Sequence, residues 1–244
     1  MILGFDTATS ATAAAVWTPG GPAVERRDDP APDGRPAHAS RLLVLIEEAL
    51  AAAGAGWDEV ERIAVGVGPG GFTGLRLGIA TARALAQARN LPLVGVSSLE
   101  ALAAGAADDA RPFVVDEARW DADRAAEGKG VSPLYVVAVI DARRGEVFAA
   151  SPNRFGPLAI APADLAARLE PGSLAIGDGA VRFREELERA GAVVPVDGSE
   201  LHRVSALHVC RLGADKPPGD RDALLPDYCR EPDAKPRSTQ SLPP

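Results

Sequence analysis

The stretch GPGGFTGLRLG, residues Gly68–Gly78, decides the fold of this chain. The short apolar run Ile63–Val67 precedes it and predicts a buried strand, whereas the alanine-rich segment Ile79–Asn90 that follows predicts a helix. The stretch is therefore a glycine-rich turn from a strand to a helix. Turns of this kind are where α/β proteins commonly bind ligands, although they also serve to pack a helix tightly on its sheet.

The segments around this turn alternate between strands and helices. Ile2–Asp6 and Ala13–Trp17 are β-rich runs that predict an opening hairpin, and Pro36 predicts the start of a helix. After the glycine-rich turn, Leu93–Val96 predicts another buried strand and Ser98–Ala107 a short helix. The first half of the chain is therefore predicted to be an α/β unit.

The second half repeats the opening pattern. Tyr135–Asp141 predicts a strand that ends in an aspartate, and Glu146–Ala150 predicts a returning strand after a turn at 142–145. The first strand of the chain ends in the same way, at Asp6. A weak internal repeat of this kind predicts two related α/β lobes that face each other, with Asp6 and Asp141 at the cleft between them.

These patterns divide the chain into four parts. We expect a first lobe at 1–107, an acidic insertion at 108–133, a second lobe at 134–225 and an irregular, proline-rich tail at 226–244. Residues 108–129 carry seven acidic and four basic side chains with little apolar periodicity. Such a composition is typical of a solvated insertion between two domains.

The overall composition is that of a globular protein with an acidic surface. The 244 residues carry a formal net charge of −8 and show no basic stripe, so we expect contact with nucleic acid to depend on another subunit. No apolar run approaches the roughly 18–20 residues of a membrane span, and Met1–Asp6 lacks the basic region of a secretory signal. Cys210 and Cys229 form no CxxC pattern, which favours two reduced thiols. We therefore expect a cytoplasmic protein without membrane contact.

Several motifs, in their order along the chain, resemble the TsaB (YeaZ) family. They are DTAT at 6–9, the helix that begins near His38, GPGGFTGLRLG at 68–78, PLVGVSSLEAL at 92–102, VIDARRGEVF at 139–148 and PDYCREPDA at 226–234. The resemblance covers most of the first 105 residues and much of the second half, but not the acidic insertion. One departure is Gly71, where the family usually has serine, so any contact of that hydroxyl is missing here.

This resemblance implies an α/β fold of the actin-like, sugar-kinase-like (ASKHA) class, with two ribonuclease-H-like βαβ lobes. It also implies a place in the complex that adds threonylcarbamoyl to the N6 atom of the adenosine beside the anticodon, in tRNAs that read ANN codons. The partners expected on this basis are a TsaD-like transferase, a TsaE-like ATPase and, through the complex, tRNA. A homodimer is the other assembly that the resemblance allows.

The resemblance further predicts a non-catalytic subunit that activates the transferase by docking on it. The paralogous TsaD carries, after the strand that corresponds to Leu93–Val96, a motif whose two histidines lie four residues apart on a helix and bind a metal. Ser98 and Leu102 stand at those positions here, and neither side chain can hold Zn²⁺ or Fe²⁺. The three histidines of the chain have no zincin spacing. We therefore expect no metal site, no catalytic residue and no glycoprotease activity.

The sequence also disfavours nucleotide binding by this chain alone. Pro69 removes one backbone N–H from the glycine-rich turn and no P-loop lysine follows, while the first hairpin turn, 7–12, contains no glycine, lysine or arginine. We expect a vestigial ligand cleft and no cofactor. On this view a nucleotide would bind only at an interface with a partner. The expected residues of the cleft are Asp6, Thr7, Gly68, Gly70, Asp141, Gly177 and Gly179. The alternatives are that both aspartates only cap turns, or that the chain is a small-molecule kinase or ATPase of the same fold.

The helix after the glycine-rich turn carries small residues at four-residue intervals, namely Gly74, Gly78, Ala82 and Ala86. A glycine inside a helix costs about 1 kcal/mol relative to alanine, so another backbone is expected to approach this stripe closely. That backbone belongs either to the helix's own sheet or to a partner, and the resemblance favours the partner. The expected partner interface consists of these four residues with His38, Leu42 and Arg76, although His38 also fits a buried, hydrogen-bonded core position. On this interpretation Gly78→Leu weakens assembly and leaves the monomer folded.

Overall fold

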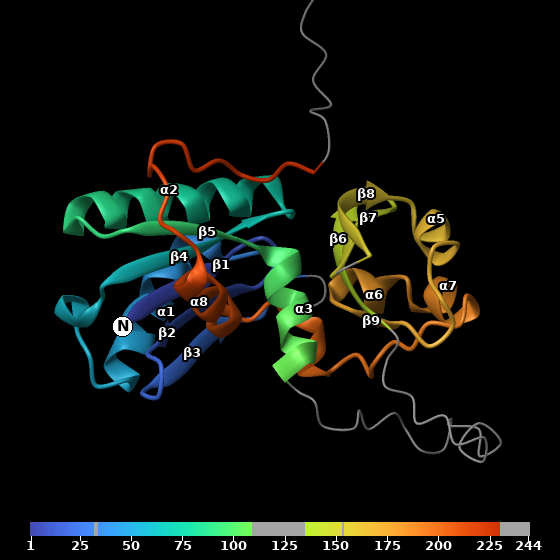
Figure 1. The fold of residues 1–244 in the computed structure, drawn as a ribbon, viewed down its shortest axis with the longest axis horizontal. Helices are drawn as coiled ribbons and strands as arrows, with labels where there is room; N and C mark the ends of the chain where they lie inside the picture. The colour runs from blue at the N-terminus through green and yellow to red at the C-terminus, as the bar shows by residue number, and fades with distance from the viewer. Residues whose placement is uncertain (32–33, 109–134, 153, 230–244) are drawn as a thin grey trace, which may run out of the picture.

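The structure is a computed structural model, and it describes residues 1–31, 34–108, 135–152 and 154–229. Two β-sheets form its framework, one in each half of the chain, and helix α3 lies between them (Figure 1). Apart from its first residue, the expected acidic insertion lies outside the described residues, as does the tail beyond residue 229.

The first sheet has five strands in the order β3-β2-β1-β4-β5. They are β1 (Ile2–Asp6), β2 (Thr12–Trp17), β3 (Ala23–Asp28), β4 (Arg62–Gly68) and β5 (Leu93–Ser97). The pairs β1–β2 and β2–β3 are antiparallel, whereas β1–β4 and β4–β5 are parallel. Because side chains alternate along a strand, Leu3 and Phe5 enter one core, while Ala13 and Ala15 enter a smaller core on the opposite face.

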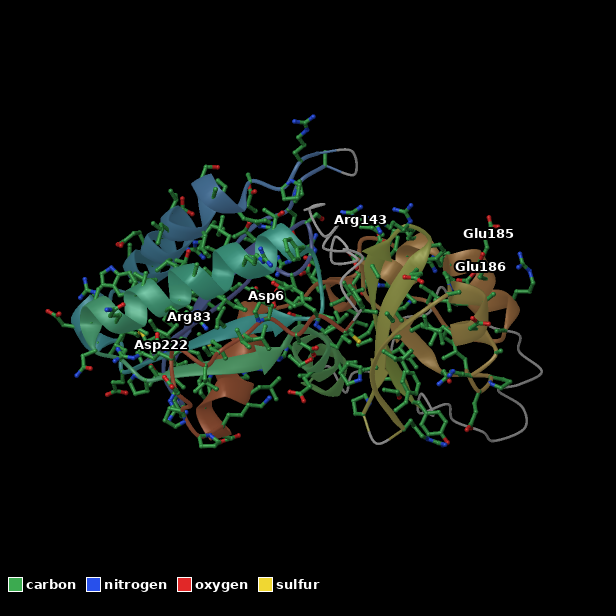
Figure 2. The ribbon with its side chains drawn as sticks, turned by 90° about the horizontal axis from the view of Figure 1, so that it is seen from above. Asp6, Arg83, Arg143, Glu185, Glu186 and Asp222 are labelled. Atoms are coloured by element: carbon green, nitrogen blue, oxygen red, sulfur yellow. The ribbon has the colours of Figure 1, made fainter. Side chains whose placement is uncertain are left out.

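Helices cover both faces of this sheet. Helices α1 (His38–Ala52) and α2 (Phe72–Arg89) lie side by side over the first face, as Figure 2 shows from above. Helices α3 (Ser98–Asp108) and α8 (Ala206–Asp215) pack over the other. A single turn of 3₁₀ helix, Trp57–Glu59, leads from α1 into β4. No helix in the described part of the chain has the length and apolar character needed to cross a membrane.

The glycine-rich stretch is more helical than the sequence predicts. Helix α2 begins at Phe72 rather than at Ile79, so Gly74 and Gly78 lie inside its first two turns. Gly71 occupies the N-cap position in an extended conformation and offers no side chain to the cap. Asn90 ends the helix in the left-handed conformation, in agreement with the predicted end.

The second sheet has four strands in the order β8-β7-β6-β9. They are β6 (Val136–Arg143), β7 (Glu146–Ser151), β8 (Phe155–Ile160) and β9 (Leu174–Ile176). In each sheet the first strand pairs antiparallel with the second and parallel with the fourth, so the two lobes share one topology. The helices of this lobe are α5 (Pro162–Ala166), α6 (Asp178–Arg182), α7 (Arg184–Arg189) and a 3₁₀ turn at Glu200–His202.

The boundary of the second lobe differs from the expected one. The sequence predicts a lobe that extends to residue 225, but α8 packs on β1, β2 and β4 of the first sheet. Residues 206–229 therefore belong spatially to the first lobe. A core that includes Val96, Leu102 of α3 and Ile140 joins the two lobes.

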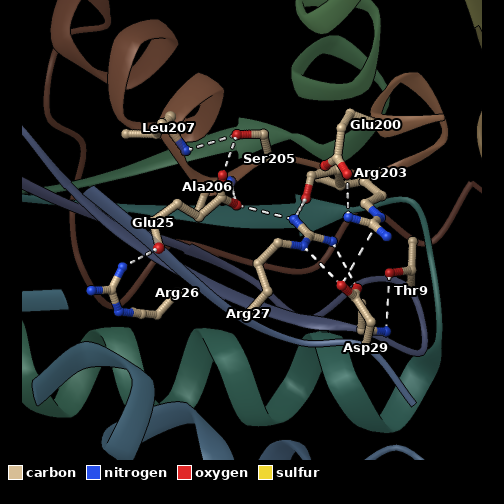
Figure 3. Close-up of polar contacts among 12 residues, drawn as sticks. Thr9, Glu25, Arg26, Arg27, Asp29, Glu200, Arg203, Ser205, Ala206 and Leu207 are labelled. Carbon is tan, nitrogen blue, oxygen red and sulfur yellow. Dashed lines mark hydrogen bonds and ion pairs between the residues drawn. The ribbon is translucent and has the colours of Figure 1, made fainter. Parts of the chain in front are cut away.

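Side chains of strand β3 bind residues 204–206, where the chain returns from the second lobe to the first (Figure 3). The carboxylate of Glu25 accepts hydrogen bonds from the Ser205 hydroxyl and the Ala206 amide, at 2.8 and 2.9 Å. Arg27 donates to the carbonyl oxygen of Val204 at 2.8 Å and pairs with Asp29. An acidic side chain at the start of α8 also complements the positive end of the helix dipole.

Candidate functional site

A cavity of about 1030 Å³ lies between the two lobes. The first lobe contributes the β1–β2 turn, the start of α1 and the first turns of α2, and the second lobe contributes the β6–β7 turn. Of the residues expected at a ligand cleft, Gly70 and Asp141 line this cavity, whereas Asp6, Thr7, Gly68, Gly177 and Gly179 do not.

The two aspartates of the internal repeat have different environments, which corrects the expectation that both face the cleft. Asp6 is buried, and its carboxylate accepts hydrogen bonds from the Ser98 hydroxyl at 2.5 Å and the Ala8 amide at 2.8 Å. Burial raises the pKa of Asp6. Asp141 lies at the cavity wall, where its carboxylate pairs with Arg182 at 3.1 Å and with Arg143 at 3.3 Å.

The remaining predicted cleft residues serve packing. The Thr7 hydroxyl donates to the Gly74 carbonyl at 2.8 Å, so it is already used within the first lobe. Gly68 lies against Leu75, while Gly177 and Gly179 lie against the backbone of β6. The Gly177 amide donates to Nδ1 of His202 at 3.0 Å.

The small-residue stripe of α2 faces its own sheet. A side chain at Gly74 would overlap the carbonyl oxygen of Thr7, and one at Gly78 would overlap the Thr7 hydroxyl. Ala82 and Ala86 are fully buried in the core over the first sheet. The expectation that this stripe contacts a partner is therefore corrected, because the close approach that it permits is internal.

Two further residues expected at the partner interface are also internal. Leu42 is buried in the core of the first lobe. His38 is buried with its Nδ1 atom 2.8 Å from the Thr12 hydroxyl, and burial lowers its pKa. Arg76, in contrast, is exposed, so it is the one member of the predicted interface on the surface of α2.

A different set of α2 residues points outward. Thr73, Ala80 and Ala84 are exposed and Leu77 is half-buried, and together they recur at intervals of four, three and four residues. This is the spacing of a helix seam that packs against another helix. On α1, which lies beside α2, Leu43 and Val44 are 53% and 41% exposed. We call these six residues the outer face: Leu43, Val44, Thr73, Leu77, Ala80 and Ala84.

Residues 219–229, which we call the C-terminal strap, cover the other flank of α2 (Figure 1). Arg83 donates to the carbonyl oxygens of Asp222 and Leu224, and Figure 2 shows Arg83 close to Asp222. The Asp227 amide donates to Val67 at 2.8 Å. At the end of the strap, Tyr228 stacks on Phe72 with ring centroids 5.4 Å apart.

The cavity is also lined by charged and aromatic residues that the sequence pattern does not predict at a cleft or an interface. They are Arg35, Phe72, Arg143, Arg144, Phe148, Asp178, Asp227 and Tyr228. One signal was present in the sequence, because two adjacent arginines occupy a hairpin turn, where glycine, asparagine and aspartate are usual. The other residues come from five separate segments, so only the folded chain brings them together.

Comparison with known proteins connects this geometry to one family. A family model described as "TsaD: tRNA N6-adenosine threonylcarbamoyltransferase" matches residues 33–116. The tRNA threonylcarbamoyladenosine biosynthesis protein TsaB of Escherichia coli is 35% identical over 153 residues. That alignment covers 63% of this chain and 55% of the E. coli protein, so the chain spans about half the length of this curated relative.

Two longer matches extend over nearly the whole chain. An uncharacterized protein of Mycobacterium tuberculosis is 33% identical, with 96% of this chain and 94% of that protein aligned. The solved structure of YeaZ from Pseudomonas aeruginosa is 25% identical and superposes with a TM-score of 0.62, covering 87% of this chain and 90% of that one. From the ordered motifs, the shared two-lobe α/β fold and these matches, the chain belongs to the TsaB/YeaZ family.

Proposed function

We propose that this chain is a non-catalytic subunit that docks on a TsaD-like transferase and thereby enables the addition of threonylcarbamoyl to tRNA adenosine. Support comes first from membership of the TsaB/YeaZ family. With a net charge of −8, the chain is expected to reach tRNA through the complex, in which a more basic subunit makes most phosphate contacts.

The start of α3 supports a non-catalytic role. Ser98 and Leu102 stand where the resemblance places the metal-binding histidines of TsaD. The Ser98 hydroxyl donates to Asp6, and Leu102 is buried in the core that joins the lobes. These positions therefore contribute to folding rather than to metal binding, and catalysis is assigned to the partner.

The strongest support for docking is the outer face on α1 and α2. It exposes apolar and small side chains at helix-packing intervals, and the cost of leaving Leu43 and Val44 in water is relieved when a partner covers them. The segment matched by the TsaD model, 33–116, contains both helices. A TsaD-like partner would thus present an equivalent helix pair, and two such pairs can pack face to face about a pseudo-twofold axis.

Charge insertion on the outer face tests the proposal. We expect Ala84→Glu and Leu43→Glu each to weaken binding to the TsaD-like partner at least about tenfold, because a carboxylate at the centre of an apolar interface loses its water. Isothermal titration calorimetry on the purified proteins measures the change. Ala163→Glu is the matched control, since Ala163 is exposed on α5 in the second lobe.

Equal affinities for the three variants and the parent chain would overturn the assignment of the outer face. Light scattering of the chain without the partner is a second test, because it shows whether the chain forms a homodimer. A stable homodimer that the same two substitutions dissociate would show that a second copy of the chain, rather than the transferase, occupies the face.

A further inference from the structure

His202 lies buried where the chain leaves the second lobe. It is the last residue of the 3₁₀ turn Glu200–His202, after which the chain returns to α8 on the first lobe (Figure 1). Its neighbours Leu201 and Val204 belong to the core that joins the two lobes. The imidazole of His202 therefore lies at the joint between the lobes, outside the lining of the inter-lobe cavity.

Two backbone groups determine the protonation state of this ring. The Gly177 amide donates to Nδ1 of His202 at 3.0 Å, so Nδ1 carries no proton. The Nε2 atom lies 3.0 Å from the carbonyl oxygen of Pro195, which can only accept, so Nε2 carries the proton and donates it. The buried ring is therefore a neutral imidazole in a single tautomer.

An imidazolium does not fit this arrangement. A proton on Nδ1 would face the Gly177 amide, so that two donors would meet at the distance of one hydrogen bond. Gly177 is buried, has a φ of +110° and packs against the backbone of Val139, so the β9–α6 turn has little room to adjust. Protonation would therefore displace the ring and leave the buried Gly177 amide without its acceptor.

The charges around His202 give an imidazolium little support. Arg184 of α7 also donates to the Pro195 carbonyl, and its positive charge opposes a second one on the ring. Asp197 acts in the other direction, but its side chain is 70% exposed and pairs with Arg184. Burial, with a contribution from Arg184, holds the pKa of His202 below its ordinary value.

Helices α3 and α6 also pack against the 3₁₀ turn. The charged groups of these elements have partners of their own: Glu200 pairs with Arg203, Asp178 accepts the Asp141 amide, Arg182 pairs with Asp141, and Glu100 pairs with Lys216. The ring is therefore held by backbone groups rather than by a carboxylate that would favour its charged form.

We propose that His202 is a pH-sensitive switch at the joint between the lobes, which in its neutral form holds the β9–α6 turn against the segment 195–205 and releases both when protonated. Leu102 of α3 lies against Gly177, so the release reaches the core that joins the lobes. Helices α1 and α2 lie on the opposite face of the first sheet and keep their structure. This switch is additional to the proposed docking and does not depend on it.

The neutral ring should make the protein less stable as the pH falls. A histidine whose pKa in the folded state lies below its unfolded value of about 6.5 takes up a proton on unfolding. Its contribution to stability is complete above pH 6.5 and is lost progressively as the pH falls from about 6.5 to the folded-state pKa. His38 is also buried with a lowered pKa and acts in the same direction, so the test needs a local measurement.

Hydrogen exchange of the full-length chain at pH 7.5 and 5.5, measured by NMR and corrected for the intrinsic exchange rates, provides that measurement. We expect the Gly177 amide and the segments 174–182 and 195–205 to lose protection about tenfold at pH 5.5, while α1 and α2 keep theirs. Imidazole ¹⁵N spectra at pH 7.5 should show a proton on Nε2 of His202 and none on Nδ1.

His202→Asn removes the titrating group, and its Oδ1 atom can still accept from the Gly177 amide. The variant should have a lower Tm at pH 7.5, because the bond to Pro195 is lost, but its exchange should no longer depend on pH. His208→Asn is the matched control, since it removes a half-buried histidine from α8, and it should keep the tenfold change.

If His202→Asn does not fold, the tautomer and the exchange of the parent chain decide. The proposal is wrong if Nδ1 of His202 carries the proton at pH 7.5, or if the Gly177 amide is equally protected at both pH values. A loss of protection shared equally by α1 and α2 would overturn it, because it would indicate general acid unfolding. So would a pH response of His202→Asn equal to that of the parent chain.

Discussion

Thr7 determines how closely α2 approaches the first sheet. Its hydroxyl donates to the carbonyl of Gly74, and its own carbonyl and hydroxyl occupy the space that side chains at Gly74 and Gly78 would fill. Both glycines are therefore required by one buried contact between the β1–β2 turn and the helix. The cost of two glycines in a helix is offset by this hydrogen bond and by the close packing around it.

Gly78→Leu should destabilise the monomer. The added side chain meets the Thr7 hydroxyl, which can move only by giving up its bond to Gly74. Overpacking of this kind costs about 3 kcal/mol, which corresponds to a Tm lower by roughly 6–12 °C for a chain of this size. Thermal unfolding followed by circular dichroism measures the change.

Ala80→Leu is the control for that substitution, because Ala80 lies two residues further along the same helix and is exposed. Its Tm should stay within about 2 °C of the parent chain, as for most surface changes. A folded Gly78→Leu monomer of unchanged Tm would show that the stripe is not part of the core, which is what the sequence-based interface predicts.

The two aspartates of the internal repeat differ in a way that the sequence pattern does not reveal. Asp6 ends β1, and Asp141 lies two residues before the end of the equivalent strand β6. The two are indistinguishable by sequence pattern, yet only Asp141 lines the cavity. The difference arises because Ser98, 92 residues away in sequence, donates to Asp6. A hydrogen bond of that sequence separation leaves no local signature, so the sequence could predict both aspartates near the cleft but not which one would be buried.

At the scale of elements, α2 has three functionally different flanks. One flank is the small-residue stripe against the sheet, one carries Arg76 and Arg83 beneath the C-terminal strap, and the third is part of the outer face. The strap covers a flank that would otherwise be open, and it leaves the outer face free. Because the sheet covers one flank of α2 and the strap another, the outer face is the flank that stays open to the proposed partner.

Arg83→Met should loosen the strap without unfolding the lobe. The substitution removes the hydrogen bonds from Arg83 to the Asp222 and Leu224 carbonyls and keeps a side chain of similar length. Loss of these bonds should lower the protection of the Asp227 amide against hydrogen exchange by about tenfold. Hydrogen exchange measured by mass spectrometry reports the change, and Gln87→Met, on the exposed surface of the same helix, serves as control.

Most elements could be predicted from periodicity, and the exceptions have physical reasons. Strand β8 contains Gly156 and Pro157, which predict a turn, but it lies at the edge of its sheet, where a missing N–H is tolerated. The second half of the chain alternates between predicted helices and strands, and one helix is predicted over 180–190. In the structure this helix is interrupted at Phe183, where the backbone leaves the helical region between α6 and α7. Helix α2 starts early because packing on Thr7 of the β1–β2 turn compensates for the low helix propensity of its glycines.

At the scale of the whole molecule, one topology is used twice for different purposes. The first lobe carries the outer face and the strap, while the second lobe contributes the arginine turn to the cavity. The internal repeat could be recognised in the sequence, but the packing of α8 on the first lobe could not be predicted from it. That return depends on Glu25 and Arg27, which lie about 180 residues before the groups that they bind.

Reconstitution of the tRNA modification tests the central claim most directly. A TsaD-like transferase and a TsaE-like ATPase are combined with an ANN-reading tRNA and with a TsaC-type enzyme, which makes the threonylcarbamoyl-adenylate that the transferase uses. Threonylcarbamoyladenosine is quantified by mass spectrometry with and without this chain. We predict modification only when this chain is present, its loss with Ala84→Glu, its retention with Ala163→Glu, and no transfer by this chain alone. Transfer by the chain without the other proteins, or an unchanged rate when it is omitted, would contradict the account.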